Sequence, residues 1–107
     1  MKIDDLKMIL TFEQIKETVQ TYFKDKPVKK VFLFGSYAKG NATENSDVDF
    51  VFEMPDNARI SYWSLANYII DLEKKLNKKV DLVENKLIYP KLKKEIDINK
   101  ILILSNE

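Results

Sequence analysis

Histidine and cysteine are both absent from the 107-residue sequence. Without cysteine, the chain can form no disulfide bond, no thiolate metal site and no thiol nucleophile. Without histidine, it can carry neither a Ser-His-Asp triad nor imidazole acid–base catalysis. Any catalysis must therefore use carboxylates, lysines, hydroxyls, backbone amides and a recruited metal ion.

Arginine is scarce, because Arg59 is the only arginine among 18 basic residues. Lysine is a flexible point charge, so the planar two-bond contacts that arginine makes to phosphate are largely missing. The 17 acidic residues leave a formal net charge of +1, which predicts no stable binding to nucleic acid.

Long apolar runs are also missing, and none approaches the length of a membrane span. Asp4 and Asp5 interrupt the start of the chain, where a signal peptide would need a continuous apolar region. Only two glycines and three prolines accompany a hydrophobic content of 45%, which excludes intrinsic disorder. We therefore expect a cytoplasmic protein that forms one domain over residues 1–107 and does not bind a membrane.

The apolar residues that are present follow alternating helical and strand periods. They predict helices over residues 11–24, 61–76 and 87–97, a short helix from Gly35, and strands over 28–34, 48–53, 80–83 and 100–104. Thr11 and Gln14 have the spacing of a capping box at the start of the first helix. Pro90 lies near the first turn of the last helix. This order indicates an α/β fold in which helices pack on a sheet.

The helix over residues 61–76 is the longest predicted one, and it carries an apolar stripe. The stripe consists of Tyr62, Leu65, Ile69, Leu72 and Leu76. We interpret the flank formed by Trp63 and Ile70 as additional core, with a surface for a partner as the alternative.

Gly35 and Ser36 follow the strand over residues 28–34, at a point where a short helix can begin. Backbone N–H groups and a serine hydroxyl at such a junction are suited to binding a phosphate. On its own, the pair also fits an ordinary turn after a strand. A P-loop is excluded, since Gly40 is not followed by Lys and Ser or Thr. Tyr37 fits either stacking on a base or packing after the turn.

Asp47 and Asp49 stand two residues apart at the start of the next predicted strand. Strand alternation places both carboxylates on one face, about 6.6 Å apart along the chain, while Val48 and Phe50 point into the core. The repulsion between the carboxylates favours a bound divalent cation such as Mg²⁺, which prefers carboxylate oxygen.

Asp81 is a lone acid in a later apolar strand. If that strand pairs beside the strand of Asp47 and Asp49, three carboxylates converge. An acid on the open face of a half-buried strand is the alternative. A phosphate site that faces such carboxylates fits two-metal phosphoryl or nucleotidyl transfer.

The pattern G-S-x-A-K-G followed by S-D-x-D resembles the minimal nucleotidyltransferases of the DNA polymerase β superfamily. It comprises Gly35, Ser36, Ala38, Lys39, Gly40, Ser46, Asp47 and Asp49. The resemblance implies a polymerase-β-like fold on a small mixed β-sheet, with Asp81 as the third acid. It also implies two Mg²⁺ ions at Asp47, Asp49 and Asp81. The substrate ATP would then be held by Gly35, Ser36, Lys39 and Ser46.

Members of this family commonly pair with a HEPN-domain ribonuclease toxin. The resemblance therefore implies an antitoxin that transfers AMP to a tyrosine of that partner. The family usually has arginine where this chain has Lys39, whose ammonium lacks the planar fork. A non-catalytic antitoxin that blocks its partner by occlusion is the alternative. Both hypotheses predict the same fold, and they differ in a covalent change that depends on metal and NTP.

Overall fold

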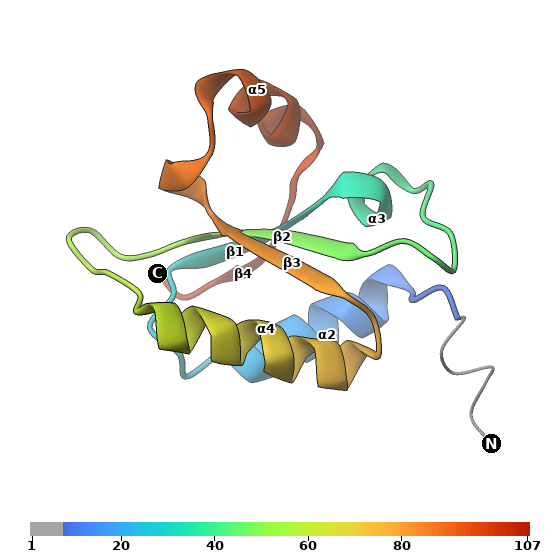
Figure 1. Ribbon diagram of the computed structural model, residues 1–107, viewed down its shortest axis with the longest axis horizontal. Coiled ribbons are helices and arrows are strands. Elements are labelled where there is room, and N and C mark those ends of the chain that lie inside the picture. Colours follow the sequence, from blue (N-terminus) through green and yellow to red (C-terminus); the bar gives the residue numbers. More distant parts are fainter. Residues whose placement is uncertain (1–7) are drawn as a thin grey trace.

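The chain alternates helices and strands in the computed structural model, which describes residues 8–107 (Figure 1). The helices are α2 (Phe12–Phe23), α3 (Gly35–Lys39), α4 (Tyr62–Leu76) and α5 (Pro90–Asn99), with a short 3-10 turn, η1 (Asn85–Leu87). The strands are β1 (Lys30–Phe34), β2 (Val48–Glu53), β3 (Val80–Glu84) and β4 (Ile101–Ser105).

The strands form one mixed sheet of four strands in the order β3-β2-β1-β4. β1 runs antiparallel to both β2 and β4, whereas β2 and β3 are parallel. The parallel pair requires a crossover, which α4 provides. The C-terminal end of β1 therefore lies beside the N-terminal ends of β2 and β3. This arrangement confirms the predicted α/β fold with a small mixed sheet.

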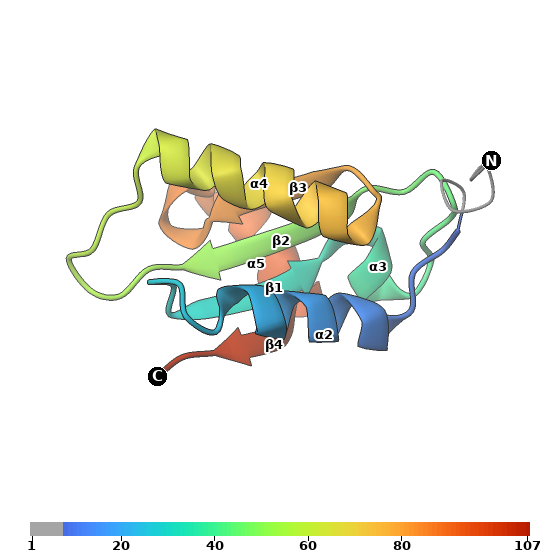
Figure 2. The same ribbon diagram turned by 90° about the horizontal axis from the view of Figure 1, so that it is seen from below.

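Helices cover the two faces of the sheet unequally. Figures 1 and 2 show α2 and α4 side by side on one face, and α5 on the other. The larger core lies under α2 and α4, and its fully buried side chains include Phe23, Phe50, Phe52 and Leu72. The smaller core lies under α5 and consists of Phe32, Val51 and Ile96. The face under α5 is thus the more open one.

Most predicted element boundaries agree with the structure to within two residues. β2 has the predicted bounds, and Thr11 and Gln14 form the predicted capping box. The Gln14 amide donates to Thr11 Oγ1 at 3.1 Å, and the Thr11 amide donates to Gln14 Oε1 at 2.8 Å. The last helix is the exception, since it begins at Pro90 and not at residue 87. Proline favours the first helical position and disfavours helix at the residue before it.

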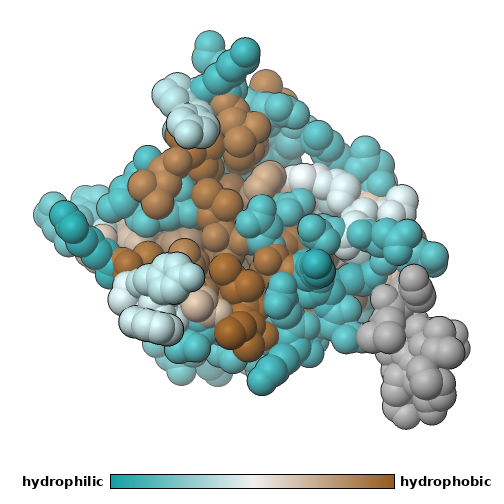
Figure 3. Space-filling view, viewed as in Figure 1, coloured by the Kyte–Doolittle hydropathy of each residue, from teal (hydrophilic) through white to brown (hydrophobic). Residues whose placement is uncertain are grey.

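The predicted apolar stripe on α4 is wrong at its N-terminal end. Tyr62 and Trp63 are each 76% exposed, and Ile70 is 48% exposed, so the Trp63–Ile70 flank is not core. Tyr68 is buried instead, with its ring edge-on against Phe23 at a centroid distance of 5.4 Å. Fewer apolar residues of α4 are therefore buried than the sequence pattern predicts. Figure 3 shows hydrophobic side chains gathered on the surface across β3, between α5 and α4.

None of the helices within residues 8–107 is long and apolar enough to cross a membrane.

Candidate active site

Gly35 and Asp49 meet where β1 ends and β2 begins. Phe34, the last residue of β1, pairs with Asp49 in the antiparallel register. Gly35 follows with a φ of 73°, in the left-handed region that L side chains rarely adopt. A Cβ built on Gly35 would collide with the Asp49 carboxylate and lie 3.1 Å from its Cγ. Only glycine therefore allows this carboxylate to lie against the backbone of the Gly-Ser pair.

Asp81 stands beside Asp49 on the neighbouring strand. The parallel register of β2 and β3 pairs Asp49 with Asp81, and both flank apolar neighbours that point into the larger core. Within β3, Val80 and Leu82 are buried while Asp81 is exposed. The strand pairing that the sequence required for Asp81 to approach the other acids is therefore present.

The electrostatics of this edge are unfavourable for three negative charges. Burial, followed by the charges of Asp81 and Asp47, raises the pKa of Asp49 from 3.8 to about 6. Within residues 8–107, no three acidic side chains are close enough together to ligate one metal ion as they stand. The register thus brings Asp49 and Asp81 side by side, with Asp47 in electrostatic range, and no preformed three-carboxylate cluster results.

The donor chemistry of this edge fits a divalent cation. Carboxylate oxygens from two adjacent strands are the ligands that Mg²⁺ prefers, and a cation there would counter the burial and the neighbouring negative charges that raise the Asp49 pKa. Asp47, Asp49 and Asp81 are the residues that would hold it. Their assignment as metal ligands stays a prediction.

Ser36 and Ser46 occupy different local structures. Ser36 is the second residue of α3, and its carbonyl accepts hydrogen bonds from the Gly40 and Asn41 amides, which end that short helix. Ser46 closes the turn before β2, because its Oγ accepts a hydrogen bond from the Thr43 amide at 2.8 Å. The Ser46 hydroxyl therefore orders the approach to Asp47, and its predicted contact to nucleotide stays a prediction.

Tyr37 and Lys39 both lie on α3, and their side chains contact different parts of the molecule. Tyr37 packs against the larger core, and its hydroxyl accepts a hydrogen bond from the Leu10 amide at 3.2 Å. This contact favours the packing interpretation of Tyr37 over base stacking. Lys39 Nζ lies 3.8 Å from Glu95 Oε1 on α5, so its ammonium bridges the two helices.

The contribution of α5 to this site was not predicted from the sequence. A pocket of about 120 Å³ lies between α3 and α5 and includes Gly35 and Lys39 in its lining. The α5 side chains that line it are Leu92, Glu95, Ile96 and Asn99. Their spacing of three, four and seven residues marks one helix face. That spacing was visible in the sequence, but nothing local indicated that this face meets α3.

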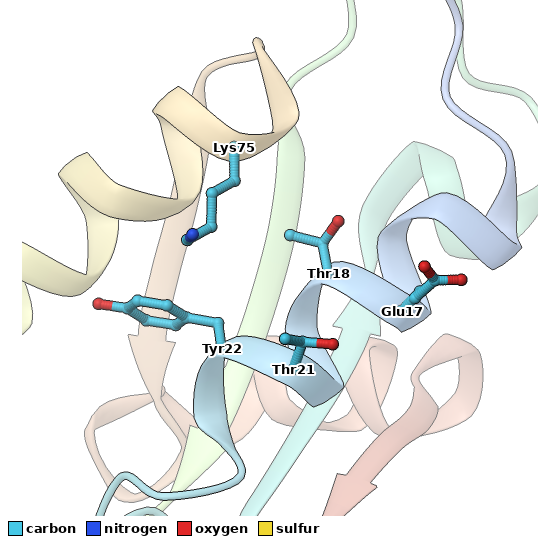
Figure 4. Close-up of a pocket in the computed structure, with 5 residues that line it drawn as sticks. All are labelled: Glu17, Thr18, Thr21, Tyr22 and Lys75. Carbon is cyan, nitrogen blue, oxygen red and sulfur yellow. The ribbon is translucent and has the colours of Figure 1, made fainter.

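A second pocket lies away from the predicted site residues. It has a volume of about 250 Å³ between α2 and α4, and Figure 4 shows Tyr22 and Lys75 in its lining with Glu17, Thr18 and Thr21. The Tyr22 hydroxyl already donates a hydrogen bond to Asp71 at 2.6 Å, which ties α2 to α4. None of the motif residues lines this pocket, and Asp49 and Asp81 lie on the opposite face of the sheet, because their strand neighbours point into the core under α2 and α4.

Comparison with known proteins identifies the family of the chain. Residues 12–103 match the family described as the nucleotidyltransferase domain. The chain belongs to this family. This nucleotidyltransferase is 41% identical over 98 residues to a Methanocaldococcus jannaschii protein named "Putative protein adenylyltransferase MJ1379". The match covers 87% of this chain and 98% of that protein.

Solved structures with the same fold come from toxin–antitoxin complexes. A chain of a toxin–antitoxin crystal structure with AMP-PNP superposes with a TM-score of 0.71 at 19% identity, covering 88% of this nucleotidyltransferase and 74% of that chain. A chain from the complex of a tri-AMPylated Shewanella oneidensis HEPN toxin with an MNT antitoxin gives 0.66 at 15% identity, covering 87% and 71%. The predicted family, fold and enzyme class are confirmed.

Proposed function

We propose that this nucleotidyltransferase transfers AMP from ATP to a tyrosine hydroxyl of a partner HEPN ribonuclease toxin, and that it thereby acts as an antitoxin. The observation that carries the proposal is the contact of the Asp49 carboxylate with Gly35, beside Asp81 in register. It places the proposed phosphate-binding motif beside two carboxylates. The name of the M. jannaschii relative and the tri-AMPylated toxin in the S. oneidensis complex support protein AMPylation.

The proposed roles follow the positions of the residues. Gly35 and Ser36 hold the terminal phosphates of the nucleotide, assisted by Lys39 and Ser46. The carboxylates of Asp47, Asp49 and Asp81 would hold two Mg²⁺ ions. Such ions would neutralise phosphate charge and favour deprotonation of the attacking hydroxyl.

Asp81 has a further role in the proposed reaction. It accepts the proton of the attacking tyrosine hydroxyl, which is a step that carboxylates can perform in a chain without histidine. The tyrosine oxygen then bonds to the α-phosphorus of ATP, and pyrophosphate leaves. The products are AMP-tyrosine on the partner and free pyrophosphate.

A protein acceptor fits this chain better than a nucleic acid. The formal net charge of +1 supplies little attraction for a polynucleotide backbone. The proposal also takes residues 1–107 to be a single cytoplasmic domain that does not bind nucleic acid stably.

The test is a mass measurement on both proteins. The chain is co-expressed with a HEPN-domain protein encoded beside its gene, and the purified proteins are incubated with Mg²⁺ and each NTP in turn. We expect the HEPN protein to gain whole AMP units with ATP only. Asp49→Asn should abolish the gain, whereas Asp56→Asn, an exposed acid in the loop after the far end of β2, should leave it unchanged. Neutralisation of the toxin without any mass change would support occlusion instead.

A further inference from the structure

The pocket between α3 and α5, called here the α3–α5 pocket, shares a wall with the proposed phosphate site. Gly35 lines the pocket and also contacts the Asp49 carboxylate. The Lys39–Glu95 ion pair links the two helices at the pocket. A molecule whose phosphates lie at Gly35 and Ser36 therefore has this pocket within reach of its remaining atoms.

The lining of the α3–α5 pocket is mainly apolar. Phe34 lies in the sheet, and Leu92 and Ile96 come from α5. Leu92 is 49% exposed, so the pocket is open to solvent on that side. Apolar walls favour the flat face of a ring and disfavour the charged phosphates of a nucleotide.

Asn99 offers a polar group of the lining to a ligand. Asn99 Nδ2 donates a hydrogen bond to the Glu95 carbonyl at 3.1 Å, which leaves its Oδ1 as a hydrogen-bond acceptor. The Glu95 carboxylate is paired with Lys39. An acceptor in an apolar setting favours a ring that carries an amino group, as adenine does at its 6-position.

The sheet order separates the two substrates of the proposed reaction. Asp81 lies on the edge strand β3, Asp49 on β2, and Phe34 and Gly35 at the end of β1. If Asp81 accepts the proton of the attacking hydroxyl, the acceptor protein approaches from the β3 side. The α3–α5 pocket lies on the β1 side, which leaves it to the nucleotide.

We propose that the α3–α5 pocket binds the nucleobase of ATP, with Leu92 as an apolar wall and Asn99 as the residue that selects the 6-amino group. This inference rests on the proposed function, because it takes the phosphates to lie at Gly35 and Ser36.

The first test compares ligands with and without a base. Binding of ATP and of inorganic tripolyphosphate, each with Mg²⁺, is measured by calorimetry for the wild type and for Leu92→Ala. We expect Leu92→Ala to weaken ATP binding at least fivefold and to leave tripolyphosphate binding within twofold. Ile98→Ala is the matched control, because Ile98 is on the same helix, 81% exposed and outside the pocket lining.

The outcomes separate this inference from the proposed function. Equal weakening of both ligands in Leu92→Ala, or no weakening of either, would overturn the nucleobase site alone. Unchanged ATP binding with slower AMP transfer would assign the pocket to the acceptor and would also overturn it. Wild-type protein that binds neither ATP nor tripolyphosphate would overturn the proposed function, and the nucleobase site with it.

The second test addresses the role of Asn99 with an analogue that lacks the amino group. Inosine triphosphate carries a carbonyl oxygen in place of the 6-amino group, so its 6-position presents an acceptor and not a donor to Asn99 Oδ1. We expect the wild type to bind ATP at least tenfold more tightly than ITP, and Asn99→Ala to reduce this ratio to about two. A structural defect would weaken both nucleotides equally. An unchanged ratio in Asn99→Ala would overturn the role of Asn99.

Discussion

Gly35 and Gly40 share a backbone conformation and differ in their surroundings. Their φ angles are 73° and 81°, both in the left-handed region. A Cβ at Gly35 would collide with Asp49, whereas a Cβ at Gly40 would have nothing within 4 Å. Substitution at Gly40 therefore measures the free energy of backbone strain alone. Substitution at Gly35 measures that strain together with the contact with the carboxylate.

We expect Gly40→Ala to lower the free energy of unfolding by about 1–2 kcal/mol, the cost of left-handed backbone for a residue with a Cβ. Gly35→Ala should cost more, because the Asp49 carboxylate must also move, and it should abolish AMP transfer. Urea denaturation and the mass assay measure the two effects. Equal losses of stability and unimpaired transfer in Gly35→Ala would contradict the close approach of Asp49.

Asp49 gives the metal-free protein a pH-dependent instability. Its pKa is raised to about 6 in the folded state, from an ordinary value of 3.8, by burial and by Asp81 and Asp47. The folded state therefore favours the protonated carboxyl more than the unfolded state does. The contribution of Asp49 to the free energy of unfolding is fully present below about pH 3.8 and is lost as the pH rises through about 6.

We expect Asp49→Asn to be more stable than the wild type in EDTA at pH 7, by about 0.5–2 kcal/mol after allowance for solvent screening. The difference should shrink as the pH falls from 7 to 4, because the wild-type carboxyl then becomes neutral as well. Denaturation curves over this range provide the measurement. A variant less stable than the wild type at pH 7 would mean that structural contacts hold the Asp49 carboxylate.

At the scale of single elements, local sequence patterns correctly predicted the features that depend on neighbouring residues alone. The capping box of α2 depends on Thr11 and Gln14 alone, and it forms as expected. The predicted start of α5 is wrong because Pro90 disfavours helical backbone at the residue before it, so the helix begins at Pro90 itself. The burial of α4 was wrong for a different reason. Which of its apolar residues are buried depends on contacts with α2 and with the sheet, and these contacts join residues that are far apart in the sequence.

The exposure of Trp63 leads to a prediction on the stability of the chain. Trp63 is 76% exposed and Leu72 is fully buried on the same helix. We expect Trp63→Ala to change the free energy of unfolding by no more than about 0.5 kcal/mol, as is usual for exposed positions. Leu72→Ala should cost about 2–5 kcal/mol, because it leaves a cavity in the core. Thermal melts of the two variants decide the matter, and a comparable loss at Trp63 would restore it to the core.

At the scale of the whole molecule, the site depends on contacts that no short pattern encodes. Gly35, Ser36, Asp47 and Asp49 could be grouped from the sequence because the motif is nearly contiguous. Asp81 could be proposed but not placed, since its approach depends on the parallel pairing of β2 with β3. The α5 residues could not be grouped with Gly35 at all, because their meeting depends on how α5 crosses the sheet. The contribution of α5 thus appears only in the folded chain.

Because the site is assembled from three strands, its ligand should stabilise the fold as a whole. If Mg²⁺ with ATP binds the folded chain as proposed, and not the unfolded one, it should raise the free energy of unfolding by mass action. At a concentration 100 times the dissociation constant, we expect a gain of about 2.7 kcal/mol for the wild type.

The loss of that gain in variants locates the ligand. Asp81→Asn should lose most of it, because β3 would no longer contribute a carboxylate to the cation. Asp56→Asn, exposed beyond the far end of β2, should retain all of it. In the wild type and in Asp56→Asn, EDTA should remove the cation-dependent part of the gain in unfolding free energy. In Asp81→Asn, EDTA should have little further effect. A full gain in Asp81→Asn would mean that the cation is held without β3, and Asp81 would then be an exposed acid on an edge strand.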